Sequence, residues 1–107
     1  MAAYFFDIDG TLCFWGSNNF IPESLATIKK LAQDGHQIIL TTRRGDDYDR
    51  HSVFGRLSVE KLVEELRLEH SVNVLHVLYN IESPRVVIND DGCTAIKCVK
   101  DKGFVTI

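Results

Sequence analysis

The sequence has 107 residues, of which 45% are hydrophobic and 25% charged, and these values are typical of one globular domain covering residues 1–107. The formal net charge of −3 leaves no basic stripe, so a nucleic-acid partner is not indicated. No apolar run approaches the roughly 20 residues that a membrane helix requires, which excludes a membrane-spanning segment.

The first half of the chain predicts a strand, a helix and a second strand. Residues 3–8 form an apolar, aromatic run of strand length. Apolar residues then recur at helical spacing in a segment that Pro22 opens and Gly35 closes, as expected for the two ends of a helix. Residues 37–42 predict a second buried strand.

The second half continues the alternation. Ser58 is expected to cap a helix that ends near His70. Three further strands are predicted at residues 72–78, 85–88 and 103–107. Strands that alternate with helices predict an α/β fold with a parallel sheet, here of about five strands, joined by right-handed crossovers.

Polar side chains follow three of the predicted strands. In chain order these residues are Asp7 and Asp9, then Thr41 and Thr42, then Asn89, Asp90 and Asp91. In an open parallel sheet, ligands bind beyond the carboxyl ends of the strands. We therefore expect these side chains to gather at one edge of the sheet.

Up to four carboxylates would meet in that crevice. Asp7 and Asp9 are two residues apart and face the same way if the strand continues through them. Like charges at that density disfavour each other's ionised form, and a hard divalent cation removes the conflict. Mg²⁺ prefers oxygen ligands and commonly takes one or two carboxylates with water and a substrate phosphate. The sequence thus predicts a site for magnesium and a phosphoryl group.

These motifs resemble those of the haloacid dehalogenase (HAD) superfamily. DIDGTL at 7–12, an apolar strand that ends in Thr41, and VVINDD at 86–91 look like its motifs I, II and IV, in the same chain order. The resemblance implies a three-layer, Rossmann-like fold and phosphoryl transfer through an aspartyl-phosphate. The implied chemistry is physically sound, because a carboxylate can act as a covalent nucleophile and a metal ion can neutralise the transferred charge.

The resemblance also implies a role for each acidic residue. Asp7 would be the nucleophile and, with Asp90, a magnesium ligand. Asp9 would protonate the leaving oxygen and later activate water, with its backbone carbonyl on the metal. Asp91 would support the metal shell. Asn89 and Asp90 remain the alternative pair for motif IV.

The phosphate-binding residues are implied less directly. Thr41 would hold the phosphoryl oxygens, with Thr42 as the alternative. The family's third motif supplies a lysine shortly before motif IV, but here no lysine lies between Lys61 and Lys97. Arg85 is the nearest cation and is expected to replace it, although a planar guanidinium differs from a point charge.

Two loops near the predicted site hold further candidates. Cationic candidates for a second anionic group on the substrate are Arg43, Arg44 and His51. Of these three, Arg43 is counted among the predicted phosphate-binding residues. Acidic residues alternate with the cations in this loop, which favours the alternative that the loop is simply solvated. Aromatic candidates for gripping the substrate, or for a subunit contact, are Phe14, Trp15 and Phe20.

The segment between Leu12 and Pro22 is too short for an inserted cap domain, so the chain is similar to small capless phosphatases of polysaccharide or sugar-phosphate biosynthesis. We expect a Mg²⁺-dependent phosphomonoester hydrolase that acts on a phosphorylated small molecule, such as a sugar phosphate, or on an exposed phosphate of a larger substrate. An open site of this kind admits large substrates or needs a neighbouring subunit as a lid, which would make the protein a homo-oligomer. The alternative is a non-catalytic phosphate-binding or assembly module that has lost the motif III lysine.

The sequence also suggests a location. The N-terminal residues show no targeting signal. The three cysteines form no CxxC pair, which argues against a disulfide framework or a zinc site. A cytoplasmic location is therefore expected. Cys13 lies close to the aspartates, but no basic partner is near it in sequence, so it is not expected to be a nucleophile.

Overall fold

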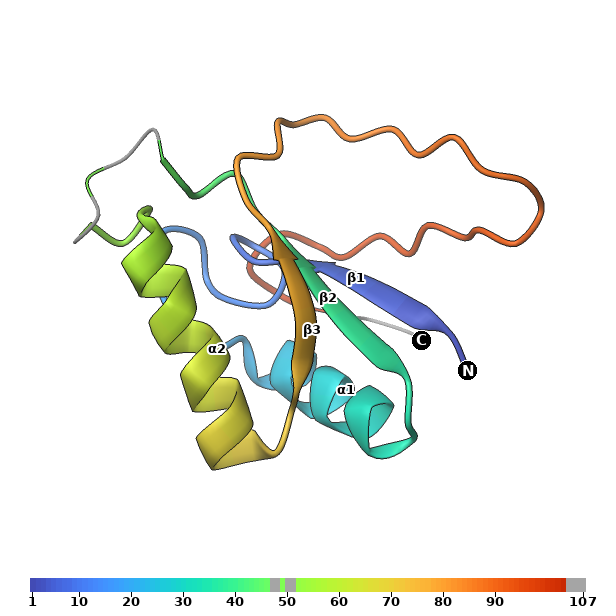
Figure 1. Cartoon of the computed structure of the whole chain (residues 1–107), viewed down its shortest axis with the longest axis horizontal. Coiled ribbons are helices and arrows are strands. Elements are labelled where there is room, and N and C mark those ends of the chain that lie inside the picture. The colour runs from blue at the N-terminus through green and yellow to red at the C-terminus, as the bar shows by residue number, and fades with distance from the viewer. Residues whose placement is uncertain (47–48, 50–51, 104–107) are drawn as a thin grey trace.

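The computed structural model describes residues 1–46, 49 and 52–103. In chain order the elements are β1 (Ala3–Asp7), α1 (Pro22–Gln33), β2 (Gln37–Thr41), α2 (Arg56–His70) and β3 (Val74–Leu78) (Figure 1). The three strands form a parallel sheet in the order β1-β2-β3. The predicted α/β fold with a parallel sheet is confirmed.

The core lies between one face of the sheet and both helices. Phe6 of β1 and Leu40 of β2 are buried on that face, and they belong to the same apolar cluster as residues of α1 and α2. The buried helical residues follow the spacing of one helix face; they are Ile28 and Leu31 in α1, and Val59, Leu62 and Leu66 in α2. Phe5, which points to the other face, is 62% exposed. Both helices therefore cover the same face of the sheet.

The helix boundaries depend on local backbone chemistry. Pro22 opens α1 within its first turn, and Gly35 follows the helix with a φ of +89°, a conformation that glycine adopts without strain. Helix α2 begins three residues earlier than expected, with Gly55 at its N-cap position. Ser58 is thus not the cap, because it lies inside the helix and its hydroxyl accepts a hydrogen bond from Arg44.

The predicted fourth strand at residues 85–88 is not present. Val86, Val87 and Ile88 are 83%, 73% and 95% exposed, and no strand of the sheet pairs with them. Only residues 79–84 separate the run at 85–88 from β3, whereas a crossover to a parallel strand needs about a dozen residues or more. The prediction was wrong because a short apolar run does not reveal whether the chain can reach a pairing edge.

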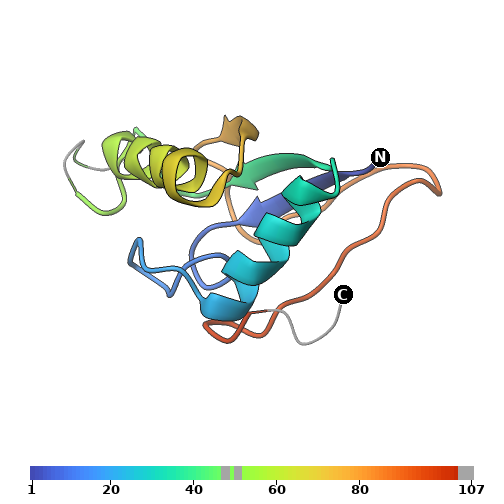
Figure 2. The same cartoon turned by 90° about the horizontal axis from the view of Figure 1, so that it is seen from below.

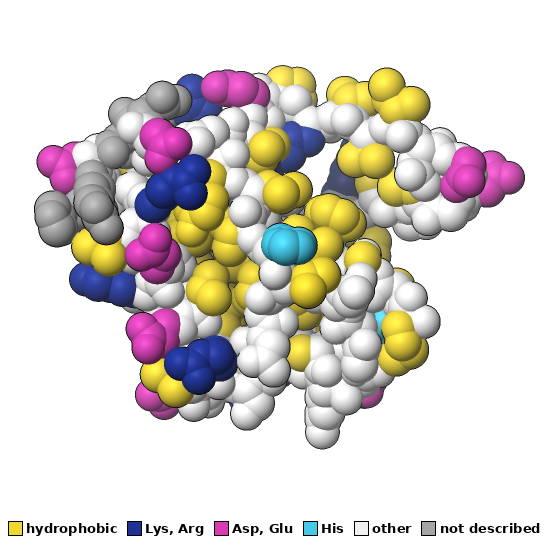
Figure 3. All heavy atoms as spheres, viewed as in Figure 1, with side chains coloured by type: hydrophobic (Ala, Val, Ile, Leu, Met, Phe, Trp, Pro, Cys, Tyr) yellow, Lys and Arg dark blue, Asp and Glu magenta, His cyan; other side chains and the backbone are white. Residues whose placement is uncertain are grey.

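Residues 84–98, here called the 84–98 segment, instead form a long excursion from the sheet. Figures 1 and 2 show it on the β1 side of the molecule, opposite α2. In Figure 3 apolar side chains lie along it and acidic ones at its tip. The sheet thus has three strands in the described part of the chain, not about five. The predicted fifth strand falls mostly on residues 104–107, outside the described residues; Gly103 makes only an isolated bridge with Val99.

Within the described residues, no helix is both long enough and apolar enough to cross a membrane. No further domain is inserted between β1 and β3 in that part of the chain, in agreement with the predicted capless arrangement.

Candidate active site

A tight loop at the end of β1 carries the two N-terminal aspartates. Asp7 is the last residue of the strand, and the buried Ile8 follows it. Gly10 then turns the chain with a φ of +83°, and the amide of Cys13 donates to the carbonyl of Ile8 at 2.9 Å. The loop therefore folds back on the strand end and fixes the positions of both carboxylates.

Asp7 forms an ion pair with Arg85. The Nη1 of Arg85 lies 2.9 Å from Oδ1 of Asp7, and its Nη2 donates to the carbonyl of Ile81 at 3.1 Å. Burial raises the pKa of Asp7 above its ordinary value, Arg85 opposes this rise, and the charge of Asp9 adds to it. Among the described residues, Arg85 is thus the cation that forms an ion pair with the predicted nucleophile.

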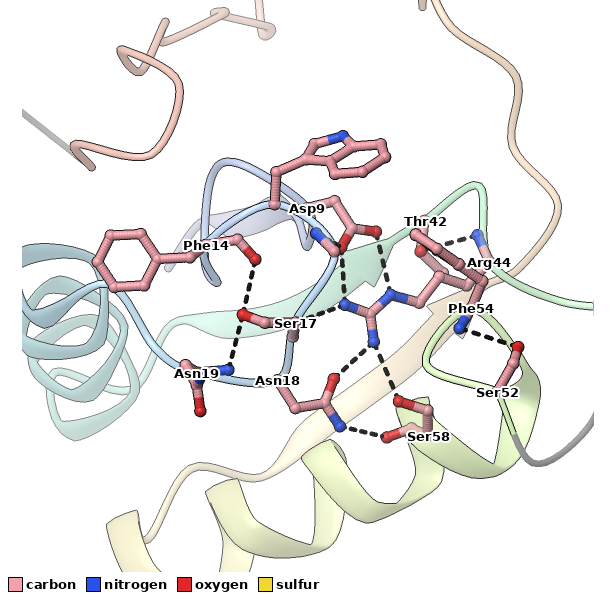
Figure 4. A network of polar contacts seen from close by, with 12 residues as sticks. Asp9, Phe14, Ser17, Asn18, Asn19, Thr42, Arg44, Ser52, Phe54 and Ser58 are labelled. Carbon is pink, nitrogen blue, oxygen red and sulfur yellow. Dashed lines mark hydrogen bonds and ion pairs between the residues drawn. The ribbon is translucent and has the colours of Figure 1, made fainter.

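Asp9 is held by a buried arginine, Arg44, whose side chain has no exposed surface (Figure 4). The Nε of Arg44 lies 3.0 Å from Oδ2 of Asp9, and its Nη2 lies 2.7 Å from Oδ1. Both oxygens of Asp9 are therefore engaged by one planar guanidinium, an arrangement that fixes the carboxylate in orientation as well as in position.

The remaining donors of Arg44 are used as well. Nη2 also donates to the carbonyl of Ser17 at 2.7 Å, and Nη1 donates to Asn18 Oδ1 at 2.6 Å and to the hydroxyl of Ser58 at 3.3 Å. An arginine has five N–H donors, so every one of them has an acceptor. Arg44 therefore joins the loop after β1, the loop after β2 and the first turn of α2 into one unit (Figure 4).

Thr41, the last residue of β2, and Thr42, which follows it, differ in their surroundings. Thr41 is paired with Asp7 in the strand register, so it lies beside the predicted nucleophile. It lines a cavity of about 430 Å³ that also touches Asp7 and Arg85. Thr42 is buried, and its hydroxyl accepts the backbone N–H of Arg44 at 3.0 Å. This geometry favours Thr41 for the predicted contact with phosphoryl oxygens.

A second cavity, of about 440 Å³, contains both aspartates. Its lining residues are Asp7, Asp9, Trp15, Arg43, Arg44, Phe54, Ser83, Arg85 and Lys100. Arg43 lies at this cavity with its guanidinium 3.3 Å from Glu82, and both side chains are largely exposed. The volume is within the range of small-molecule sites, roughly 300–1,000 Å³.

The structure does not bring Asp90 and Asp91 to this cavity. Both are exposed residues of the 84–98 segment, and Asp90 accepts hydrogen bonds from the side chain of Asn89 and the backbone of Gly92. In the part of the chain that is described, no three side chains of His, Cys, Asp or Glu are grouped closely enough to hold a metal ion. The expected crevice of four carboxylates depended on a fourth strand, which is absent.

A smaller donor set still fits magnesium. Mg²⁺ commonly binds one or two carboxylates and completes its shell with water and a phosphate. Asp7 suits this role because it lies at the cavity and its Oδ2 is not engaged by Arg85, whereas both oxygens of Asp9 are occupied by Arg44. The site therefore offers Asp7, with one oxygen that Arg85 does not engage, beside several cations that suit an anionic ligand.

Sequence reasoning underrated two cations of this cavity. Arg44 could not be told from Arg43 by sequence, since both sit in a loop of alternating charges; only folding buries one and exposes the other. Lys100 had no motif to mark it, yet it lines the cavity, whereas Lys61 and Lys97 are exposed and do not.

The cysteine candidate, Cys13, does not line the cavity. Cys13 is buried, and this burial raises the pKa of its thiol to about 12, so it stays protonated at neutral pH. His51 lies outside the described residues.

Comparisons with known proteins add family information. Residues 4–69 match the family of haloacid dehalogenase-like hydrolases. Among solved structures, the D,D-heptose 1.7-bisphosphate phosphatase from B. bronchiseptica, crystallised with magnesium and phosphate, is similar with a TM-score of 0.57 and 19% sequence identity. The similarity covers 87% of this chain and 54% of that one, so the chain spans about half the length of this relative. No curated protein matches.

Proposed function

The chain belongs to the family of haloacid dehalogenase-like hydrolases, and on that premise we propose that it hydrolyses phosphomonoesters with Mg²⁺ as cofactor. The observation that supports this most is the pairing of Asp7 with Arg85 at the cavity that also holds Asp9. A nucleophilic carboxylate, a cation for the phosphoryl group and a second carboxylate for proton transfer are the groups that the reaction requires.

The first step transfers the phosphoryl group to the protein. A carboxylate oxygen of Asp7 forms a bond to phosphorus while the bond to the leaving oxygen breaks, and the leaving oxygen takes a proton from Asp9. Arg85 lies 2.9 Å from Asp7 and neutralises charge on the group in transfer. Bound Mg²⁺, held by Asp7 and the phosphate oxygens, would supply further positive charge to the same group.

The second step releases phosphate. Water attacks the phosphorus of the aspartyl-phosphate and gives a proton to Asp9, while the bond between phosphorus and the Asp7 oxygen breaks. Asp7 is thereby released as a carboxylate and Asp9 regains its proton. Arg44 keeps Asp9 aimed at the cavity through both of its oxygens.

We propose a cytoplasmic location and a phosphorylated small molecule as substrate; an exposed phosphate on a larger partner would reach the same open cavity. The second candidate function is a non-catalytic phosphate-binding module. The observation in its favour is that Asp7 is paired with Arg85 and not with the lysine that the family's third motif supplies.

The test is a panel of phosphomonoesters assayed with and without Mg²⁺, on the wild type and on Asp7→Asn. We expect turnover that requires Mg²⁺ and disappears in the variant, because the nearly isosteric amide keeps the fold and removes the nucleophile. Circular dichroism checks that the variant is folded. Hydrolysis at the wild-type rate in Asp7→Asn would exclude the aspartyl-phosphate route, and a wild type that binds phosphate and Mg²⁺ by calorimetry but hydrolyses nothing would support the binding module.

A further inference from the structure

One wall of the cavity around Asp7 and Asp9 presents a large aromatic ring to solvent. Trp15 lines this cavity and is 58% exposed, and it is the only tryptophan in the sequence. An indole buries much apolar area when it is covered, so leaving it open forgoes stability. An open indole at the mouth of a polar cavity is what a binding surface for an apolar group requires.

The backbone holds this ring in a fixed place relative to the acids. The amide of Trp15 donates to Oδ1 of Asp101 at 2.6 Å, and the amide of Asp101 donates to the carbonyl of Gly10 at 2.9 Å. The next amide along, that of Gly16, donates to Oδ1 of Asp9 at 3.2 Å. The backbone that carries the ring is thus held at Trp15 and at Gly16, which lowers the entropy cost of ordering this segment when a ligand binds.

A second ring extends the surface. Phe54, from the loop before α2, lies with its ring centroid 5.6 Å from that of Trp15 at an interplanar angle of 58°. Both residues line the cavity, and we call them the Trp15–Phe54 wall. The Nζ of Lys100 lies 5.4 Å from the centroid of the Trp15 ring, so a cation borders the same wall.

The rest of the lining decides what kind of group the wall accepts. Apart from the wall, the cavity is lined by acids and cations, and Ser83 is the one uncharged polar side chain among the described lining residues. The Trp15–Phe54 wall itself offers a sugar ring only the indole N–H as a hydrogen-bond partner, so hydroxyl groups placed against the wall would lose partners on leaving water. A flat aromatic ring needs only an aromatic face, and base–aromatic stacking tolerates any base.

We propose that the substrate is a phosphomonoester whose leaving group carries a planar aromatic ring that stacks on the Trp15–Phe54 wall, as a nucleoside monophosphate does. The phosphate would then lie at Asp7 and Arg85, with the ring against Trp15. The cavity of about 440 Å³ admits a ligand of this size. The assignment of the phosphate end rests on the proposed function, whereas the stacking surface stands on the geometry of the wall.

The test compares adenosine 5′-monophosphate with ribose 5-phosphate, in which a hydroxyl group takes the place of the base. Binding is measured by calorimetry on the folded Asp7→Asn chain, where no turnover interferes, and by quenching of the single tryptophan. We expect the nucleotide to bind at least about tenfold more tightly, or about 1.4 kcal/mol, and to quench the fluorescence. Equal affinities, or a preference for ribose 5-phosphate, would overturn the proposal.

Variants of the wall provide the second measurement. Trp15→Leu should reduce the nucleotide preference to less than about threefold, while Trp15→Phe should keep most of it because a ring remains. If Trp15→Leu does not fold, Phe54→Leu is used instead, and it should also reduce the preference for the nucleotide. A preference that survives in the leucine variant would show that the base binds elsewhere.

Kinetics separate this inference from the proposed function. A wild type that prefers the nucleotide in binding but hydrolyses neither ligand would refute the proposed function and keep the stacking surface. A wild type that hydrolyses ribose 5-phosphate with a kcat/KM equal to or above that for the nucleotide would keep the phosphatase and refute the aromatic substrate.

Discussion

At the scale of single residues, the site has two arginines with different roles, one paired with each aspartate. Arg85 is partly exposed and faces Asp7, and Arg44 is fully buried and bound to Asp9. An exposed ion pair contributes little to stability, whereas a buried one becomes costly when one partner is removed. We therefore expect Arg85 to matter for turnover and Arg44 for the fold as well as for the position of Asp9.

Replacing Arg85 tests its role as the cation of the phosphoryl site. We expect Arg85→Ala to lower kcat/KM by at least about a hundredfold, or about 2.7 kcal/mol of transition-state stabilisation. Arg85→Lys should retain part of the activity because it keeps a positive charge. Steady-state kinetics on a responsive substrate measure both variants. An alanine variant with wild-type kcat/KM would make Lys100, which lines the same cavity, the next candidate.

Replacing Arg44 tests its buried ion pair with Asp9. Arg44→Met leaves the carboxylate of Asp9 and the acceptors of Asn18 and Ser58 without their partner. The free energy of unfolding should fall by about 3–5 kcal/mol, the usual loss when one member of a buried ion pair is removed. Urea denaturation measures it.

The neighbouring arginine is the matched control for that experiment. Arg43→Met removes an exposed cation paired with Glu82 and should change the unfolding free energy by less than about 1 kcal/mol. Equal losses in the two variants would contradict the burial of Arg44.

At the scale of elements, strand β1 and helix α1 are determined by patterns within their own residues, but the 84–98 segment is not. The run at 85–88 has the composition of a strand and lacks a partner. Arg85 ties its start to Asp7, at the carboxyl end of β1, whereas a parallel neighbour of β1 would have to start at the opposite end. The segment therefore leaves the sheet with its apolar side chains exposed.

Two isoleucines test this arrangement with the same substitution. Ile28→Ala in α1 removes a fully buried side chain and should cost about 2–5 kcal/mol of unfolding free energy. Ile88→Ala, at 95% exposure, should change it by no more than about 0.5 kcal/mol. Chemical denaturation measures both. A loss above about 1 kcal/mol at Ile88 would show that the segment is packed and would favour the fourth strand that the sequence predicts.

At the scale of the whole molecule, the site is assembled from segments that are distant in sequence. The loop after β1, the loop after β2, the chain after β3 and Lys100 all reach one cavity beyond the carboxyl ends of the strands. This is where ligands bind in open parallel sheets. A ligand that joins these segments should stabilise the native state as a whole.

A magnesium titration measures that linkage. Binding to the native state alone stabilises it by about 2.7 kcal/mol when the ion is at a hundredfold excess over its Kd, so Tm should rise. Asp7→Asn should abolish the rise, because Asp7 is the fitting carboxylate at the cavity. An unchanged Tm in the wild type would argue against a magnesium site.

Asp90→Asn tests, in the same assay, whether Asp90 binds magnesium. The family resemblance implies that it does, whereas the structure places it away from the cavity. The exposed position of Asp90 leads us to expect a rise in Tm like that of the wild type. If the rise disappears in this variant, Asp90 is a metal ligand, as its place after VVI implies.

The sequence alone determined the elements β1, α1, β2, α2 and β3 closely and indicated Asp7, Asp9 and Arg85, because periodicity, turn residues and short motifs are local properties. It missed the start of α2 by three residues, since Ser58 is a good capping residue whose hydroxyl is used by Arg44 instead. Only the tertiary structure decided which of two adjacent arginines is buried, that Thr41 lies beside Asp7, and that residues 85–88 have no strand to pair with. Each of these depends on contacts between segments far apart in the chain, and such contacts leave no pattern within either segment.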